Sequence, residues 1–479
     1  MDNFQNIFGI VVAGFYWLLT AGVTARVIAL RNPVSVTLAW LLVIFILPVV
    51  GAILYLLVGE LNLGRKRAER AAQMVEPYLG SPRSGSYPPA SLPGGELTRA
   101  LDQLLITQVG IAAQSYADLR LLGAAEAIFD ELCRDVRSAV HNIRIETYIW
   151  HPGGRVDELV DELVEACRRG VRVSLLLDHA GSRPFFRSNA CTRLQEAGAE
   201  VVAALPVRPL RALAHRIDLR LHRKLIVIDD RVAYTGSMNI ADPAYFKQDA
   251  EVGQWIDVML RVDGQAAAGL AKVFAWDWEV ETGERYLPAS DLGEASHSKW
   301  LMVIPSGPGN GEDLIGQAVL LGIYRANQQI IISTPYFVPS EAILDALCQA
   351  ARRGVRVKLL LPRRNDSVMV NWASRAYFAE LLDAGVEIHL FYGGLLHTKA
   401  MLMDDQLALV GSVNLDIRSL QLNFELTVAV TTPEGCRDVA NLLASYQASS
   451  ERLMRERWEQ RSRAARALER LMYFMSPLL

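Results

Sequence analysis

Residues 221–230, LHRKLIVIDD, and residues 396–405, LHTKAMLMDD, are nearly one sequence written twice. After the first Asp of each copy, six residues lead to Gly-Ser-x-Asn, and the His and Asn of each copy stand 17 positions apart. The matched residues are His222, Lys224, Asp229, Gly236, Ser237 and Asn239 in the first copy, and His397, Lys399, Asp404, Gly411, Ser412 and Asn414 in the second. Matched positions that occur twice form a far more specific pattern than a single His-x-Lys pair.

The sequence around the two copies repeats as well. A β-branched run at 143–150 (IRIETYIW) has a counterpart at 329–337 (QIIISTPYF), and each is followed by a helical pattern, RRGVRV and an apolar run. Alternating strands and helices are typical of an α/β sheet covered by helices. A period of about 180 residues indicates two related domains. We expect two pseudo-symmetric α/β domains at 97–290 and 291–479, each with a mostly parallel sheet, and a C-terminal helix in the second.

The N-terminal region contains two long stretches without charge, at 7–25 and 34–58. Their lengths match the roughly 20 apolar residues that are needed to cross a bilayer. We therefore predict a two-helix transmembrane hairpin over residues 1–64. Buried core helices are the alternative for both stretches. A signal peptide is the alternative for the first, although residues 1–5 lack the basic start of such a peptide.

Basic residues near these stretches predict the orientation of the hairpin. Two arginines lie in the connecting loop, whereas four basic residues follow the second stretch between 65 and 70. This excess predicts that the C-terminal body lies in the cytoplasm. Residues 65–96 are expected to form a linker that is basic at first and then rich in Gly, Ser and Pro.

The composition argues against several classes of function. The net charge of -3 does not favour a nucleic-acid-binding protein. The five cysteines are scattered and form no C-x-x-C pair, which argues against a zinc ribbon or a disulfide framework. The motif residues do not include a clustered ligand set either, so neither a metal nor a cofactor is expected.

The two copies differ in the segment before the first His. From the preceding glycine to the His there are 24 positions in the first half and 12 in the second. The longer segment, at 206–224, is basic, and its arginines at 216, 220 and 223 are candidates for binding an anionic substrate. A solvated basic loop remains the alternative. The arginines of this segment are Arg208, Arg211, Arg216, Arg220 and Arg223.

The paired motif residues fit phosphoryl chemistry at one shared site. Residues two apart in a strand share a face, so the His and Lys of each copy should point the same way. One His can attack phosphorus, and the other can give and take a proton. The two Lys and the two Asn (Asn239 and Asn414) can stabilise charge on the phosphoryl oxygens. The predicted catalytic set is His222, Lys224, Asp229, His397, Lys399 and Asp404, in which the two Asp are expected to support the turn after the strand.

A nucleophilic His needs a carboxylate that fixes its tautomer. Glu251 lies 29 residues after the first motif His, and Glu425 lies 28 residues after the second. These two residues are predicted to orient the His rings. Asp249 and Asp257 are rivals in the first half, and ordinary charges at strand ends are the alternative.

The motifs resemble the phospholipase D superfamily, and the fuller pattern resembles bacterial cardiolipin synthases of the two-motif type. The supporting stretches are GELNLGRKR (59–67), ETYIW (146–150), STPYFVP (333–339) and GSVNLDIRSLQLNFE (411–425). The resemblance implies transfer of a phosphatidyl group between two phosphatidylglycerol molecules, which gives cardiolipin and glycerol through a phosphohistidine. It also implies a multi-pass protein of the bacterial inner membrane.

The same resemblance implies that His222 is the nucleophile and His397 the general acid and base, although the repeat itself is too symmetric to fix this order. The alternatives are a hydrolytic phospholipase D, a transferase with another donor or acceptor, and a membrane-anchored lipid-binding scaffold. A nuclease is less favoured, because membrane spans give such an enzyme no evident advantage. The C-terminal segment 468–479 is expected to pack on the body or to lie on the bilayer surface.

Overall fold

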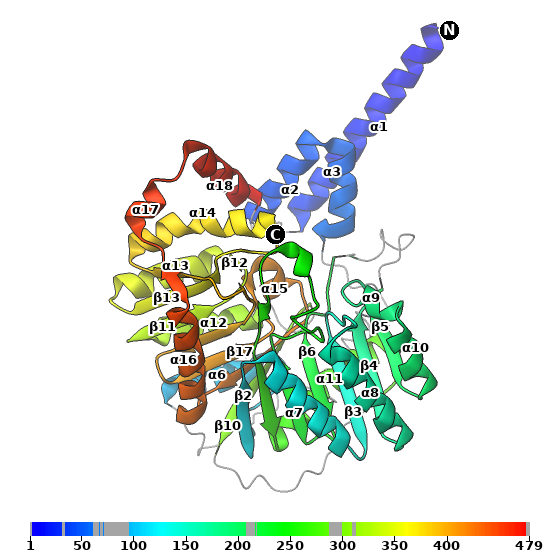
Figure 1. Ribbon diagram of the computed structural model, residues 1–479. Coiled ribbons are helices and arrows are strands. Elements are labelled where there is room, and N and C mark those ends of the chain that lie inside the picture. Colours follow the sequence, from blue (N-terminus) through cyan, green and yellow to red (C-terminus); the bar gives the residue numbers. More distant parts are fainter. Residues whose placement is uncertain are drawn as a thin grey trace.

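The body consists of two α/β halves that lie side by side, and the N-terminal helices project from one end of it (Figure 1). This is a computed structural model. It describes residues 2–30, 34–60, 67, 70, 95–206, 216, 218–286, 299–308 and 313–475.

The first half is built on a seven-stranded sheet with the order β2-β9-β7-β6-β3-β4-β5. Its strands are β2 (Asp118–Leu122), β3 (Asn142–Thr147), β4 (Arg172–Asp178), β5 (Glu200–Ala204), β6 (Lys224–Ile228), β7 (Val232–Gly236) and β9 (Met259–Asp263). The pairs β3–β4 and β4–β5 are parallel, and the other neighbouring strands are antiparallel. The expectation of a mostly parallel sheet is therefore wrong.

The second half repeats this arrangement within a nine-stranded sheet of order β1-β10-β19-β17-β16-β11-β13-β14-β20. Its strands are β1 (Gln114–Ser115), β10 (Trp300–Ser306), β11 (Gln329–Ser333), β13 (Arg356–Pro362), β14 (Glu387–Phe391), β16 (Ala400–Met403), β17 (Leu407–Gly411), β19 (Glu425–Val430) and β20 (Ser450–Arg452). The pairs β11–β13 and β13–β14 are parallel. In both halves the motif strand turns back as a hairpin, β6–β7 or β16–β17, and this tight return makes the pairing antiparallel.

Helices cover the two sheets, and one of them joins the halves. The helices are α6 (Glu96–Val109), α7 (Ala125–Ser138), α8 (Arg155–Arg168), α9 (Arg183–Phe186), α10 (Asn189–Glu196), α11 (Gln265–Thr282), α12 (Leu314–Arg325), α13 (Glu341–Arg352), α14 (Val368–Ala384), α15 (Ile417–Gln421), α16 (Pro433–Ala448), α17 (Arg455–Glu459) and α18 (Arg463–Met475). Helix α11 is apolar on most of its surface and contacts β6, β7 and β9 of the first sheet and β1 and β10 of the second. It therefore belongs to a core that is continuous between the halves.

The start of the body belongs to the second half rather than to the first. Helix α6 packs against α12, and strand β1 pairs with β10. The chain therefore contributes β1 to the second sheet before it forms the first sheet. The sequence instead predicts that residues 97–290 all belong to the first domain.

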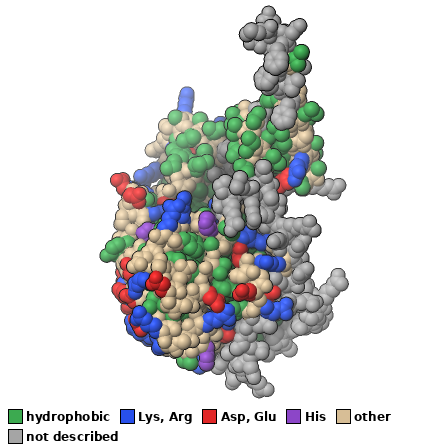
Figure 2. Space-filling view, turned by 90° about the vertical axis from the view of Figure 1, so that its right-hand side faces the viewer, with side chains coloured by type: hydrophobic (Ala, Val, Ile, Leu, Met, Phe, Trp, Pro, Cys, Tyr) green, Lys and Arg blue, Asp and Glu red, His purple; other side chains and the backbone are tan. Residues whose placement is uncertain are grey.

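The N-terminal region forms three helices and a short π-helical turn: α1 (Asp2–Ala29), α2 (Val34–Ile46), α3 (Pro48–Leu54) and Tyr55–Gly59. The second apolar stretch, expected as one helix, is interrupted at Leu47, because Pro48 cannot continue the hydrogen bonding of α2. In the part of the chain that the structure describes, no helix combines the length and the apolar character that crossing a membrane requires. Figure 2 shows hydrophobic side chains gathered on these helices. Trp17, Leu38 and Phe45 are exposed apolar residues of α1 and α2.

Most of the predicted linker lies outside the described residues, but two of its basic residues are placed. Arg67 forms an ion pair with Glu281 at 2.6 Å, and the Arg70 guanidinium donates to the Val280 carbonyl oxygen at 3.1 Å. Both contacts are made near the C-terminal end of α11. The N-terminal segment is thereby tied to the helix that joins the two halves.

The C-terminal segment packs on the body as helix α18. It contacts α14, and the rings of Tyr377 and Tyr473 meet edge to face with centroids 5.6 Å apart. Residues 476–479 lie outside the described residues.

The two motif aspartates support turns and do not reach the cavity that the histidines line. Asp229 accepts hydrogen bonds from the backbone N–H groups of residues 140–142, and Asp404 accepts them from those of residues 327–329. Each Asp therefore ties the turn after its motif strand to the residues that lead into the neighbouring strand. Their inclusion in the predicted catalytic set is wrong, while the expectation that they support the turn agrees with these contacts.

We predict that Asp404→Ala lowers the melting temperature of the protein by several degrees. Three backbone donors lose their acceptor, which costs about 1–3 kcal/mol, and Asp404 also has a positive φ of 50° that Ala adopts less readily. Differential scanning fluorimetry measures the shift. The neighbouring Asp405→Ala is the control, because Asp405 is exposed. Equal shifts for the two variants would contradict the supporting role.

Candidate active site

The two repeated motifs meet at one cavity between the halves of the body. Its volume is about 610 Å³, and His222, Asn239, His397 and Asn414 all line it. His222 and His397, which are 175 positions apart, thus line the same cavity, as the pseudo-symmetry of the repeat predicts.

His222 is held by the second half of the chain. Its backbone N–H donates to the Phe424 carbonyl oxygen at 2.9 Å, next to a β-bridge between Leu221 and Phe424. The ring Nδ1 lies 2.8 Å from Oε1 and 2.9 Å from Oε2 of Glu425. Glu425 is fully buried and also accepts a hydrogen bond from the Ser412 hydroxyl at 2.5 Å. These contacts fix both the orientation and the tautomer of the ring.

His397 is held by the first half in the same way. The short strands β8 (Trp255–Ile256) and β15 (Leu395–Leu396) pair in parallel, and the His397 N–H donates to the Ile256 carbonyl oxygen at 2.9 Å. The ring Nδ1 lies 2.6 Å from Oδ1 of Asp257, which also accepts from the Ser237 hydroxyl at 2.6 Å. Each half therefore supplies the carboxylate that orients the other half's His.

The prediction that Glu251 orients a His is wrong. Glu251 is exposed in a turn with a positive φ of 53°, where its own carbonyl oxygen accepts a hydrogen bond from Arg364, and Asp257 takes the place beside the ring. Asp257, a rival candidate from the sequence, is located by the strand pairing and not by its spacing from a His. In both halves, the carboxylate lies two residues before the residue that pairs with the motif Gly. The pairs are Gly236 with Met259 and Gly411 with Thr427.

At each motif Gly the backbone of the neighbouring strand is too close to leave room for a side chain. A Cβ atom on Gly236 would collide with the Val258 carbonyl oxygen, and one on Gly411 would collide with that of Leu426. The close pairing brings the following Ser hydroxyls onto the two carboxylates. The Gly-Ser pair thus sets the position of each His indirectly.

Both motif lysines are buried beside their histidines. Lys224 Nζ donates to the His222 carbonyl oxygen at 2.6 Å. Lys399 Nζ donates to the His397 carbonyl oxygen at 2.7 Å and lies 2.7 Å from His397 Nε2. Burial lowers the pKa of Lys224 to about 8 and moves the pKa of Lys399 well below its usual value, although nearby carboxylates oppose both shifts. An anion in the cavity would favour the charged form of both groups.

The two histidines are neutral at pH 7 in the absence of substrate. Burial lowers the pKa of each ring to about 4, because desolvation of the charged form outweighs the attraction of Glu425 or Asp257. Burial acts in the opposite direction on Asp257, but His397 and Lys399 outweigh it and lower the pKa of that carboxyl to about 2. Each ring therefore donates Nδ1–H to a carboxylate and keeps its lone pair on Nε2.

The asparagines differ in their local partners. Asn239 Oδ1 accepts a hydrogen bond from the Ile149 N–H at 3.2 Å, whereas Asn414 Nδ2 donates to the Ser419 hydroxyl at 3.1 Å. Asn239 therefore keeps its NH₂ group as the donor for an oxygen in the cavity, while the buried Oδ1 of Asn414 has no partner among the described residues.

The arginines of the basic segment before His222 have different roles. Arg223 is fully buried, pairs with Asp277 and donates to the Glu425 carbonyl oxygen, so its predicted part in substrate binding is wrong. Arg216 pairs with Asp218 at 2.6 Å. Arg220 lines the cavity. Arg208 and Arg211 lie outside the described residues.

Several residues of the cavity are absent from the sequence-based prediction. Arg183 and Arg418 add positive charge to its wall. The Tyr148 ring lies 4.9 Å from that of His222, and the Trp255 ring lies 4.3 Å from that of His397. The ETYIW and STPYF stretches are the available sequence signal for Tyr148 and for Tyr336, which also lines the cavity, whereas Trp255 lies outside both. Within the described residues we find no cluster of three or more His, Cys, Asp or Glu side chains that could hold a metal ion.

A family model described as "Cardiolipin synthase, PLD-like domain" matches residues 132–278 and 320–446, so it covers both motif copies. The chain belongs to the cardiolipin synthase family. A second model, "Phospholipase_D-nuclease N-terminal", matches residues 17–60. Cardiolipin synthase A of Yersinia pseudotuberculosis is 48% identical over 489 residues, and that of Cronobacter sakazakii is 47% identical over 487 residues. Both alignments cover 100% of each chain.

Solved structures agree with the fold. The phosphatidylserine synthase of Haemophilus influenzae Rd KW20 matches with a TM-score of 0.57 and 15% identity, over 80% of this chain and 97% of that one. This likeness shows that the paired α/β halves are an arrangement found in another protein. The family assignment rests on the sequence relatives of the cardiolipin synthase family.

We predict that Asp257→Asn lowers kcat about a thousandfold, because the amide can stabilise the wrong tautomer of His397 and cannot balance its charge. Glu251→Gln should keep kcat within about twofold, since the Glu251 side chain is exposed. Steady-state kinetics and a melting curve for each variant make the comparison. The assignment fails if Glu251→Gln is the more damaging of the two, or if Asp257→Asn is fully active.

Proposed function

We propose that the chain transfers a phosphatidyl group from one phosphatidylglycerol molecule to the glycerol hydroxyl of another, which gives cardiolipin and glycerol. The observation that carries this proposal is the pair of histidines that line one cavity, each oriented by a carboxylate of the opposite half. The curated relatives at 48% and 47% identity are named cardiolipin synthase A. As a member of this family the chain is a phosphatidyltransferase of the phospholipase D superfamily that acts on phospholipid.

In the first step His222 Nε2 attacks the phosphorus atom of the donor lipid. The P–N bond forms as the bond from phosphorus to the glycerol oxygen breaks, and Glu425 stabilises the charge that develops on the ring. The departing oxygen takes a proton from His397. The anionic phosphate raises the pKa of His397 above the value of about 4 that the ring has without substrate, so a protonated ring can form in the complex.

In the second step the acceptor lipid replaces the departed glycerol. His397, now neutral, takes the proton of the acceptor hydroxyl while that oxygen attacks phosphorus. The P–N bond breaks, His222 returns to its neutral form, and His397 is again protonated. Lys224, Lys399 and Asn239 stabilise the non-bridging oxygens in both steps.

Two differences between the histidines favour this order of roles. The His222 side chain is 12% exposed and that of His397 is 4% exposed, so phosphorus reaches the first ring more easily. Lys399 Nζ lies 2.7 Å from His397 Nε2 and engages its lone pair, which makes this nitrogen the poorer nucleophile of the two.

Family membership indicates a membrane-associated bacterial protein, and we further propose that the N-terminal helices insert into the inner membrane with the catalytic halves in the cytoplasm. Exposed apolar side chains such as Trp17, Leu38 and Phe45 support this placement. Attachment to a bilayer keeps the cavity beside a concentrated supply of donor and acceptor.

The function is tested with the full-length protein in nonionic detergent and phosphatidylglycerol as the sole lipid, with products read by mass spectrometry. We expect cardiolipin and glycerol in equal amounts. Phosphatidic acid with glycerol would show a hydrolase instead. Bound lipid without turnover would show a scaffold, and turnover that begins only when phosphatidylethanolamine is added would show another donor.

The order of the two histidines is tested with a phosphatidyl ester of p-nitrophenol, whose leaving group needs no proton donor. We expect His397→Ala to release a burst of p-nitrophenol equal to the enzyme concentration and to accumulate an acid-labile phosphatidyl-histidine. His222→Ala should give no burst. A burst in His222→Ala and none in His397→Ala would reverse the assignment.

A further inference from the structure

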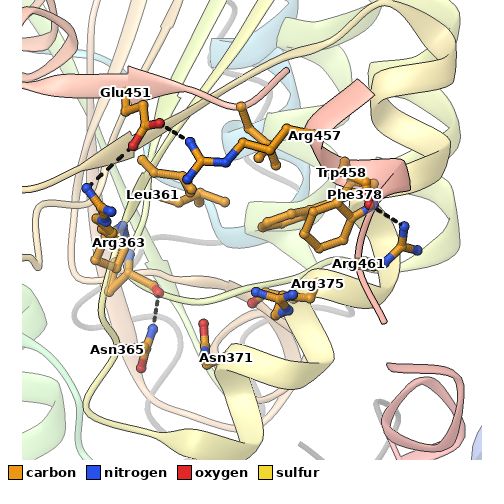
Figure 3. A pocket seen from close by; sticks show the side chains of 15 residues that line it. Leu361, Arg363, Asn365, Asn371, Arg375, Phe378, Glu451, Arg457, Trp458 and Arg461 are labelled. Carbon is orange, nitrogen blue, oxygen red and sulfur yellow. Dashed lines mark hydrogen bonds and ion pairs between the residues drawn. The ribbon is translucent and has the colours of Figure 1, made fainter. Parts of the chain in front are cut away.

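A second cavity, of about 260 Å³, lies in the second half of the body (Figure 3). It is formed where β13 ends, between α14 and the segment that runs from β20 into α17. The proposed reaction uses none of its lining residues. Four of them are arginines: Arg363, Arg375, Arg457 and Arg461.

The arginines of this cavity outnumber their carboxylate partners. Glu451 pairs with Arg457 and lies 3.4 Å from Arg363. Glu469 lies 3.2 Å from Arg375 and 2.7 Å from Arg461. Each carboxylate neutralises one of its two guanidinium groups, so each pair keeps one excess positive charge. An anion with two negative charges would balance this excess.

Two of the guanidinium groups are held in place before any ligand arrives. Arg375 and Arg461 lie over the Trp458 ring, 4.8 Å and 4.4 Å from its centroid. Glu469 is 4% exposed, so its ion pairs with both arginines are shielded from water. Among the described residues, Arg375 donates a hydrogen bond from Nε to Glu469, and its Nη atoms have no acceptor. Such a fixed fork matches the geometry of a phosphate group.

We propose that this cavity binds a phosphate group, supplied either by the headgroup of an anionic phospholipid or by free phosphate. Neutral donors in the lining, Asn371 and Ser374, add hydrogen-bonding capacity beside the arginines. The lipid is the better fit, because Val368, Met369 and Met454 next to the lining are exposed apolar side chains. They would contact the parts of a lipid that follow its headgroup.

This cavity shares a wall with the catalytic one. Pro335 and Asn365 line the arginine cavity, and their neighbours Tyr336 and Asp366 line the catalytic cavity. The Tyr336 hydroxyl donates to Asp366 at 2.7 Å. Asp366 also pairs with Lys247 at 2.9 Å. A ligand that orders this loop on one side therefore acts on residues of the active site on the other.

The test measures binding in a His222→Ala background, so that it needs no turnover and remains informative if the proposed reaction is wrong. Isothermal titration in nonionic detergent uses two probes, dihexanoyl phosphatidylglycerol and inorganic phosphate. We expect two binding events for the lipid, one in each cavity. Binding of lipid alone at the arginine cavity identifies a headgroup, and equal binding of phosphate identifies the free anion.

Two substitutions with opposite expected signs identify the event in the arginine cavity. Glu451→Gln removes a competing negative charge and should tighten that event about three- to tenfold. Asn371→Asp adds a negative charge and should weaken it at least about tenfold. Both leave the Arg375–Glu469–Arg461 contacts intact.

The control is Arg352→Gln, an exposed arginine in the last turn of α13, which should change neither event. A single binding event that neither Glu451→Gln nor Asn371→Asp alters would overturn the proposal. Weakening by both substitutions would overturn it as well, because that result reports damage to the fold rather than a change of charge.

Discussion

The structure depends on an exchange of carboxylates between the two halves. Glu425 orients His222, and Asp257 orients His397. Glu425 begins β19 and Asp257 lies just before β9, the strands that pair with the motif Gly of the same half. Each carboxylate contacts the ring of the opposite half. The interface between the halves is therefore part of the chemistry, because separating them would leave each ring without its hydrogen-bond acceptor.

The electrostatics of the cavity follow from this arrangement. Two histidines, two lysines and two carboxylates are buried in one place, and burial alone would neutralise most of them. The carboxylates offset part of that cost for the histidines, yet both rings remain neutral. A phosphate group that enters such a site meets preoriented donors, and its charge favours protonation of the groups around it.

Much of this could be predicted from the sequence, because the repeat states which residues belong together. The two His-x-Lys motifs, the two Asn and the α/β character all follow from periodicity and matched spacing. The partner of each His could not be obtained by counting from that His, since the exchange between halves has no trace in the spacing within one half. Arg223 was equally misleading, because a basic run does not tell which of its side chains turns inward to Asp277. The prediction of a mostly parallel sheet was wrong as well, because the hairpin after each motif strand reverses the chain and makes that pairing antiparallel.

The bridge between Leu221 and Phe424 and the parallel pairing of β8 with β15 each join one half to the other. This exchange fits an origin of the chain from two copies of one half. A polypeptide that held one half alone would carry a His, a Lys and a carboxylate, with the carboxylate aimed away from its own ring. It could complete a working centre solely by associating with a second copy of itself about a twofold axis. Joining the two copies in one chain preserves that geometry and frees each to diverge, as the basic segment before His222 and the arginine cavity of the second half already have.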